Sequence, residues 1–165
     1  MRTFLSIAVA AFIGIFVTGC GEEPTRPGVG AGAPSTQRIE ESSKDFGDYV
    51  LHFNAISTDQ LEPEVARAYN IVRSKNRAML TVSIIKKVEG ATGISVAGAV
   101  NATAANLTGQ VKNLTLRQIQ ENDAIYYIGD VSVANGETLI FTIDATPINE
   151  SSRFSVRMQR QFFAD

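Results

Sequence analysis

The sequence predicts an all-β domain over residues 45–165: an antiparallel β-sandwich of about seven strands, with an immunoglobulin-like outline and one short helix. Two observations lead to this fold class. From Phe46 onward apolar and polar residues alternate with a period of two, and turn-forming residues recur at short intervals. Two packed layers allow every such strand to bury its apolar face. A partly closed barrel is the alternative architecture for the same pattern.

The first half of the domain combines two alternating segments with one helical pattern. Residues 49–53 and 80–84 alternate as strands do. Between them, Pro63 to Tyr69 fit a two-turn helix, because proline at the first helical position loses no hydrogen bond. Asn70 is a suitable left-handed stop for this helix.

Turn signals divide the second half into five further strand-like segments. The strongest is Asn135-Gly136, which is typical of a two-residue type I′ hairpin because both residues tolerate positive φ. Residues 121–123 form a second turn of the same kind. The segments are Ile94–Asn106, Val111–Gln120, Ala124–Val133, Thr138–Thr146 and Arg153–Phe163.

The N-terminus has the features of a lipoprotein signal over residues 1–19. Arg2 precedes an apolar run from Phe4 to Val17 that is too short for a transmembrane span and suits a secretory signal. Val17-Thr18-Gly19-Cys20 resembles the lipobox of bacterial lipoproteins, in which the cysteine is lipidated and becomes the mature N-terminus. We therefore expect Cys20 to attach the protein to a membrane, which requires more than one acyl chain for stability.

A tether is predicted between the lipidated cysteine and the domain, over residues 20–44. Glycine, proline, serine, threonine and alanine dominate it, and no apolar periodicity is present. Gly21 follows the cysteine in place of the aspartate that commonly retains Gram-negative lipoproteins in the inner membrane. This favours the periplasmic face of the outer membrane.

Composition excludes several classes of function. The 165 residues include 15 basic and 17 acidic side chains, and a formal net charge of −2 gives no overall attraction for nucleic acid. A single cysteine cannot form an intrachain disulfide, and one cysteine with one histidine cannot supply the ligands of a zinc site. We expect no nucleic-acid partner, no metal and no cofactor.

Catalytic patterns are weak. Gly93 to Ala97 approximates the hydrolase elbow around Ser95, but it ends in alanine and no helical pattern follows. His52 alternates with Leu51 and Phe53, which indicates a position on the outer face of a strand. Nothing brings two carboxylates to the separation that glycoside hydrolysis needs. The carboxylates considered are Glu121, Asp123, Asp130 and Asp144. These observations favour a protein that is not an enzyme.

One basic segment is a candidate for binding an anionic group or a partner. Arg73, Lys75 and Arg77 are spaced by two, as on one face of a strand, and Arg67 lies near the end of the predicted helix. Such a group could bind a lipid headgroup, a cell-wall carboxylate or an acidic protein. The alternative is a solvated edge strand whose charges prevent edge-to-edge pairing, with salt bridges to Glu62 or Glu64.

Several segments resemble an uncharacterised bacterial family, domain of unknown function 4426. The similarity runs over roughly residues 45–165, and the helix with its basic continuation is its most specific part. It implies a small exported β protein and no particular activity. The resembling segments are Phe46–Tyr49, Leu61–Ile71, Arg73–Ala78, Asp123–Ile128 and Gln161–Asp165.

Two hypotheses of function follow from the sequence. The leading one is a non-enzymatic envelope lipoprotein whose sandwich binds or positions another envelope component. The alternative is a periplasmic carrier or sensor of a small ligand, with a pocket between the sheets or under the helix. An apolar cavity of ligand size would favour the second.

Overall fold

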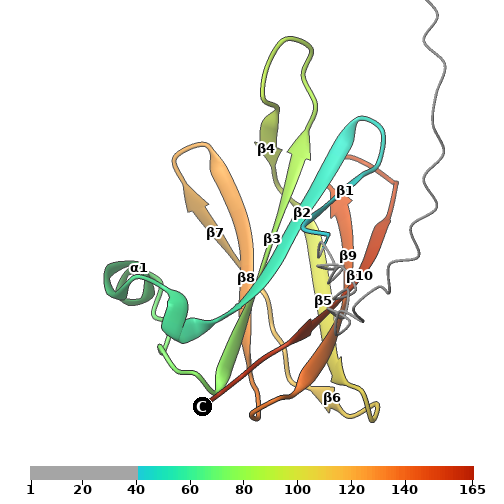
Figure 1. The fold of residues 1–165 in the computed structure, drawn as a ribbon. Coiled ribbons are helices and arrows are strands. Elements are labelled where there is room, and N and C mark those ends of the chain that lie inside the picture. The colour runs from blue at the N-terminus through green and yellow to red at the C-terminus, as the bar shows by residue number, and fades with distance from the viewer. Residues whose placement is uncertain (1–40) are drawn as a thin grey trace, which may run out of the picture. The chain divides into compact units, whose positions relative to one another are not determined.

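The computed structural model describes residues 41–165, which form two antiparallel β-sheets packed as a sandwich (Figure 1). The signal, Cys20 and the predicted tether up to residue 40 lie outside the described residues. Within residues 41–165 no helix is long and apolar enough to cross a membrane. The sandwich predicted from the alternation is confirmed.

The six-stranded sheet has the order β1-β2-β3-β8-β7, and β4 also pairs with β3. The four-stranded sheet has the order β10-β9-β5-β6. The strands of the first sheet are β1 (Ser43–Asp45), β2 (Tyr49–Ser57), β3 (Arg77–Lys86), β4 (Ile94–Val96), β7 (Arg117–Glu121) and β8 (Ala124–Ser132). Those of the second are β5 (Gly98–Asn106), β6 (Val111–Lys112), β9 (Thr138–Pro147) and β10 (Phe154–Gln161). Pairing therefore begins at Ser43, two residues before the domain start expected from the sequence.

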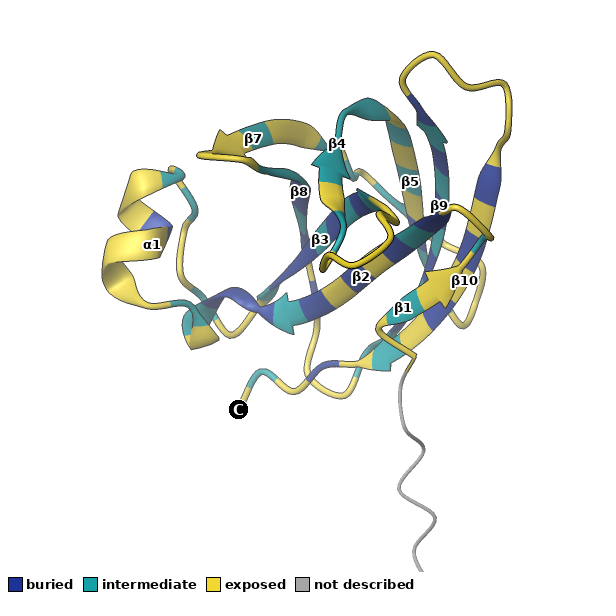
Figure 2. Cartoon of the chain, turned by 90° about the horizontal axis from the view of Figure 1, so that it is seen from above, coloured by how far each residue is buried: buried dark blue, intermediate teal, exposed yellow. Residues whose placement is uncertain are grey.

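The period-two pattern places one residue in two of each strand in the core. Leu51, Leu80 and Ile84 of the six-stranded sheet are fully buried, as are Phe141 and Ile143 of the four-stranded sheet. Figure 2 shows this alternation as a change of burial along β2 and β10. Burial of an aliphatic or aromatic side chain contributes about 1.5–3 kcal/mol, so these inward rows are the main source of stability.

The described domain has ten strands where the sequence predicts seven, because two predicted segments each contribute a strand to both sheets. Residues 94–106 divide into β4 and β5, and residues 111–120 divide into β6 and β7. Gly98 permits the first crossing, because a Cβ there would lie 2.4 Å from the carbonyl oxygen of Thr146. The third strand beyond the seven predicted is the short β1. Hydrophobic periodicity does not detect a change of sheet when the inward side stays apolar.

Tyr127 ties the two sheets together across this crossing. Its hydroxyl accepts a hydrogen bond from the amide of Gly98 and donates one to the carbonyl of the same residue, both at 2.8 Å. Its neighbour Tyr126 points to the opposite face, as strand alternation requires.

In residues 41–165 one short α-helix is present, α1 (Pro63–Ala68), and it follows a 3₁₀ turn, η1 (Thr58–Gln60). The prediction of the helix and of its stop is confirmed, because Asn70 has φ 52°. The amide of Ile71 donates to the carbonyl of Ala66 at 2.8 Å, and the amide of Asn70 donates to that of Arg67. This is a Schellman motif, and it turns Ile71 back toward the helix.

The hairpin between β8 and β9 forms where predicted, but its turn is not type I′. Gly136 has φ 71°, whereas Asn135 is not among the residues of positive φ. The amide of Glu137 donates to the carbonyl of Ala134, as in a four-residue turn with glycine at its third position. The side chain of Asn135 instead contacts the C-terminal residues, accepting from the amide of Ala164 and donating to Asp165.

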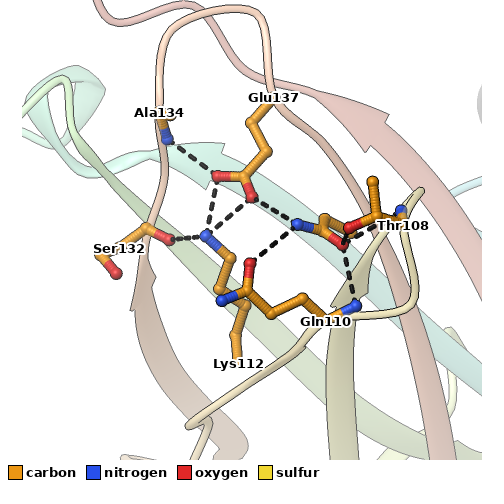
Figure 3. A network of polar contacts seen from close by, with 7 residues as sticks. Thr108, Gln110, Lys112, Ser132, Ala134 and Glu137 are labelled. Atoms are coloured by element: carbon orange, nitrogen blue, oxygen red, sulfur yellow. Dashed lines mark hydrogen bonds and ion pairs between the residues drawn. The ribbon is translucent and has the colours of Figure 1, made fainter.

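A polar network fastens this turn to the β5–β6 hairpin (Figure 3). The ammonium group of Lys112 lies 2.8 Å from both carboxylate oxygens of Glu137, which also accept from the amide of Ala134 and from Asn106. Burial disfavours the charged carboxylate, but these donors together lower the pKa of Glu137 below its ordinary value. The network therefore joins both sheets at one end of the sandwich.

Candidate binding site on the outer face of the six-stranded sheet

The basic segment predicted as an anion site does not lie on one strand. β3 begins only at Arg77, and Arg73 and Lys75 belong to the irregular connection before it. The shared face expected from their spacing is therefore wrong. The reason is that Thr58, which is fully buried, fixes this connection through its hydroxyl, which accepts from the amide of Ser74 at 2.9 Å.

Each of the four basic side chains has an acceptor within the domain. Arg67 donates to the carbonyl of Pro63 at 3.2 Å, and Arg73 donates to that of Asp59 at 2.6 Å. Lys75 donates to the carbonyl of Asp165. Arg77 forms a salt bridge with Asp130, in which its Nε lies 2.6 Å from Oδ2. The expected salt-bridge partners Glu62 and Glu64 are thus replaced by backbone carbonyls and by Asp130.

A pocket lies between α1 and the outer face of the six-stranded sheet, and we call it the helix pocket. Its volume is about 170 Å³. Met79 and Ile128 line it, and like Ala66 of α1 they are buried without being part of the core cluster between the sheets. The helix therefore covers a second, smaller apolar cluster on the outside of the sandwich. The apolar walls of the pocket are Leu61, Val65, Ile71, Met79, Ile119 and Ile128.

Local sequence rules build this pocket. The Schellman motif at Asn70 directs Ile71 into the pocket wall. Arg117 of β7 donates to the carbonyl of Tyr69, which holds the end of α1 against the sheet edge. Met79 and Ile128 are apolar residues in outward registers of their strands, and the helix shields them from water.

The polar rim of the helix pocket is formed by Tyr69 and Glu121, together with Thr81 and Tyr126. The carboxylate of Glu121 accepts a hydrogen bond from the Tyr69 hydroxyl, and this bond raises the pKa of Tyr69. A side chain entering the pocket would meet apolar walls and one carboxylate.

Two wider hollows continue the helix pocket across the sheet. The central hollow, about 360 Å³, shares Thr81 and Tyr126 with the helix pocket and extends to His52 and Ser83. The hairpin hollow, about 820 Å³, shares His52 with the central hollow and ends beside Ile94 on β4. We call the three together the outer-face trough. His52 lies on the exposed face, as its alternation predicts.

Ser95, His52 and Asp123 all line the hairpin hollow, so the residue types of a serine-hydrolase triad lie in one depression. The hydroxyl of Ser95, however, accepts from the amide of Ile125 at 2.9 Å and contacts its carbonyl oxygen at 3.4 Å. It connects β4 to β8. In residues 41–165 no hydrogen bond joins Ser95 to His52 or His52 to Asp123.

The other carboxylates considered from the sequence have separate partners. Asp130 pairs with Arg77 and Asp144 pairs with Arg153. Within the described part of the chain, no group of three or more histidine, cysteine, aspartate or glutamate side chains could hold a metal ion.

Sequence reasoning missed the trough, although one signal was present. In β3, residues 78, 80, 82 and 84 form the inward apolar row, so Met79 is an apolar residue in the outward register. Ile128 in β8 and Ile119 in β7 give the same signal. Apolar residues in outward registers indicate that another element, or a partner, covers that face.

Comparisons with known proteins agree with the fold. The family model described as "Domain of unknown function (DUF4426)" matches residues 43–165. A solved DUF4426 family protein from Pseudomonas aeruginosa is 32% identical in sequence, with a TM-score of 0.64, covering 76% of this chain and 96% of that one.

A more distant likeness concerns the fold alone. FetP of a uropathogenic E. coli strain, expressed recombinantly in the periplasm, is 14% identical with a TM-score of 0.52, covering 76% of this chain and 95% of its own. A search of the curated proteins gives no match.

Proposed function

This chain belongs to the DUF4426 family, whose description assigns no activity, and we propose that it is a non-enzymatic bacterial envelope lipoprotein that binds another envelope component. The observation that carries the proposal is the helix pocket, an apolar depression with a carboxylate at its rim. We propose that a polypeptide partner inserts one apolar side chain there. Bonding of the Ser95 hydroxyl to β8 supports a role without catalysis.

The size of the helix pocket favours a side chain over a free ligand. Sites for small molecules usually measure about 300–1,000 Å³, whereas this pocket has about 170 Å³. A cavity of about 150 Å³ is enough for benzene, so one leucine, isoleucine or phenylalanine side chain fits. Apolar anchors of this kind supply much of the free energy in protein interfaces. The alternative, a periplasmic carrier or sensor, would have to use the wider open hollows.

The proposal is tested by filling the pocket. Val65 lies on α1, lines the pocket and is 42% exposed, so Val65→Trp would occupy the space at little cost in stability. Val111→Trp is the matched control, because that valine is exposed on β6 of the other sheet. The full-length protein, extracted from solubilised envelopes after in vivo cross-linking, should lose a partner in the first variant and retain it in the second. Equal retention would contradict the proposal.

Membrane attachment through Cys20 is proposed on the lipobox. Two or three acyl chains would give stable anchoring, because each buried methylene contributes about 0.8 kcal/mol. Gly21 favours the periplasmic face of the outer membrane. Cys20→Ser should move the protein to the soluble fraction and remove the lipid mass from the mature N-terminus. Continued association of this variant with washed membranes would contradict the anchor.

A further inference from the structure

The three hollows of the outer-face trough form one continuous surface. Thr81 and Tyr126 line both the helix pocket and the central hollow, and His52 lines both the central and the hairpin hollow. The trough thus extends from α1, across β8, β3 and β2, to the β3–β4 hairpin. If a polypeptide inserts an apolar side chain into the helix pocket, the rest of the bound segment would lie along this surface.

Two arginines at the border of the trough are bonded to lining residues, Arg117 to the Tyr69 carbonyl and Arg160 to the Asn54 side chain, and the charged side chains of the trough itself are carboxylates. Its lining includes the carboxylates of Glu121 and Asp123 and no lysine or arginine. Glu121 ends β7, and Asp123 lies in the turn to β8, in which Asn122 has φ 52°. Glu121 borders the helix pocket and Asp123 borders the hairpin hollow, so acidic groups lie along one side of the trough. Arg77, at the nearby end of β3, is already paired with Asp130.

Some polar side chains on the floor of the trough have no hydrogen-bond partner in the described part of the chain. Within residues 41–165 the side chains of His52, Thr81 and Ser83 make no hydrogen bond. His52 lies directly opposite Ser83 in the register of β2 and β3, and Thr81 lies two pairs further along, opposite Asn54. A row of donors and acceptors at strand spacing suits the amide and carbonyl groups of an extended backbone.

We propose that the occupant of the trough is an extended, cationic polypeptide segment, with one apolar side chain in the helix pocket and neighbouring lysine or arginine side chains beside Glu121 and Asp123. This inference rests on the proposed function and adds the chemistry of the partner. It reverses the sign expected from the basic segment, because the cations of that segment are bonded to the domain itself and the trough is acidic.

The test uses synthetic peptides and the full-length protein in detergent. Fluorescein-labelled peptides carry leucine, isoleucine or phenylalanine as the anchor, each flanked either by two lysines or by two glutamates. Fluorescence anisotropy should show the best lysine peptide binding at least tenfold more tightly than its glutamate counterpart. Its affinity should fall as salt is raised, because exposed charges are screened. Equal binding of the two charge forms would overturn the inference.

Matched charge variants locate the effect. Glu121→Gln with Asp123→Asn should weaken the lysine peptide about tenfold. Glu62→Gln with Glu64→Gln removes the same charge from two exposed positions at the start of α1 that do not line the trough, and it should leave the affinity unchanged. Equal weakening by both double variants would overturn the inference, because net charge alone would then explain binding.

The two proposals fail in distinguishable ways. If lysine and glutamate peptides bind the unchanged protein equally and Val65→Trp weakens both, the pocket binds an apolar side chain but the cationic preference is wrong. If Val65→Trp has no effect on any peptide that binds, the helix pocket is not the site and both proposals fail. Binding of Cys20→Ser protein to anionic vesicles, with no peptide bound, would also overturn the inference in favour of a lipid surface.

Discussion

The outer faces of the two sheets differ in what their outward registers contain. On the four-stranded sheet they are mostly polar, and Thr103, Thr142 and Arg157 form one row across three strands. On the six-stranded sheet the outward residues Met79 and Ile128 are apolar and buried under α1. The first face has the usual alternation of a sheet exposed to water, whereas the second requires a cover. The helix covers part of it, and the trough is the remainder.

An aspartate introduced on the outer face of each sheet should give the largest difference in stability between the two faces. Met79→Asp would place an unpaired charge under α1 opposite Asp130, which is already paired. We expect a loss of about 3–5 kcal/mol in the free energy of unfolding, as for other uncompensated buried charges. Thr142→Asp on the other sheet should cost less than about 1 kcal/mol. Urea unfolding followed by circular dichroism measures both, and similar costs would show that α1 does not shield its face.

The stop of α1 offers a second, smaller test. Asn70→Val forces a β-branched residue into positive φ, which costs about 1–3 kcal/mol. The end of the helix should loosen, so the backbone amides at positions 70 and 71 should exchange faster with deuterium than in the unchanged protein. Asn101→Val is the control, because that residue lies in the extended β5, where valine is favoured. Unchanged exchange in Asn70→Val would mean that Arg117 alone holds the helix end.

The pH dependence of stability at acidic pH should report on an ion pair of the four-stranded sheet, between Arg153 and Asp144. A hydrogen bond from Arg153 lowers the pKa of Asp144. Stability from this pair is therefore present above the ordinary aspartate pKa and is lost as pH falls through the lowered one. Arg153→Gln should return the Asp144 pKa toward its ordinary value, as followed by carbon NMR. Arg157→Gln, on the same face, should not, and equal shifts would point to general charge effects.

The pH dependence of stability at alkaline pH should show the smallest effect, and it concerns Tyr69 at the rim of the helix pocket. The hydrogen bond to Glu121 raises the pKa of Tyr69. The associated stability is present below the ordinary tyrosine pKa and is lost as pH rises through the raised one. Glu121→Gln should lower the Tyr69 pKa in a spectrophotometric titration. Tyr69→Phe should cost only a few tenths of a kcal/mol, because the bond is exposed. A titration that is the same in Glu121→Gln would contradict this bond.

Local signals predicted local structure well. Pro63 and Asn70 mark the beginning and the end of the helix. The alternation from Phe46 onward predicted the sandwich and its inward rows. Both features could be predicted because they depend on residues close in sequence. The crossings near Gly98 and after Lys112 were missed because an inward apolar residue looks the same in either sheet.

The trough was missed for a related reason. It combines side chains from α1, β2, β3, β7, β8 and the β3–β4 hairpin, and only pairing brings them together. The basic segment was misread because its spacing resembled a strand, while the buried hydroxyl of Thr58 holds it in an irregular path. The lipidation of Cys20 stays a prediction.

The order in which the chain visits the two sheets governs how it can fold. It forms β1–β4 in one sheet and β5–β6 in the other, returns to the first with β7–β8, and ends in the second with β9–β10. Neither sheet is a continuous piece of sequence, so no cut in the chain yields half a sandwich. We expect one cooperative unfolding transition and refolding in milliseconds to seconds, as for other sandwiches built from non-local pairs. A chain that emerges N-terminus first can cover the apolar rows of β2 and β3 only in part with β5, and the cover is completed when β9 and β10 arrive.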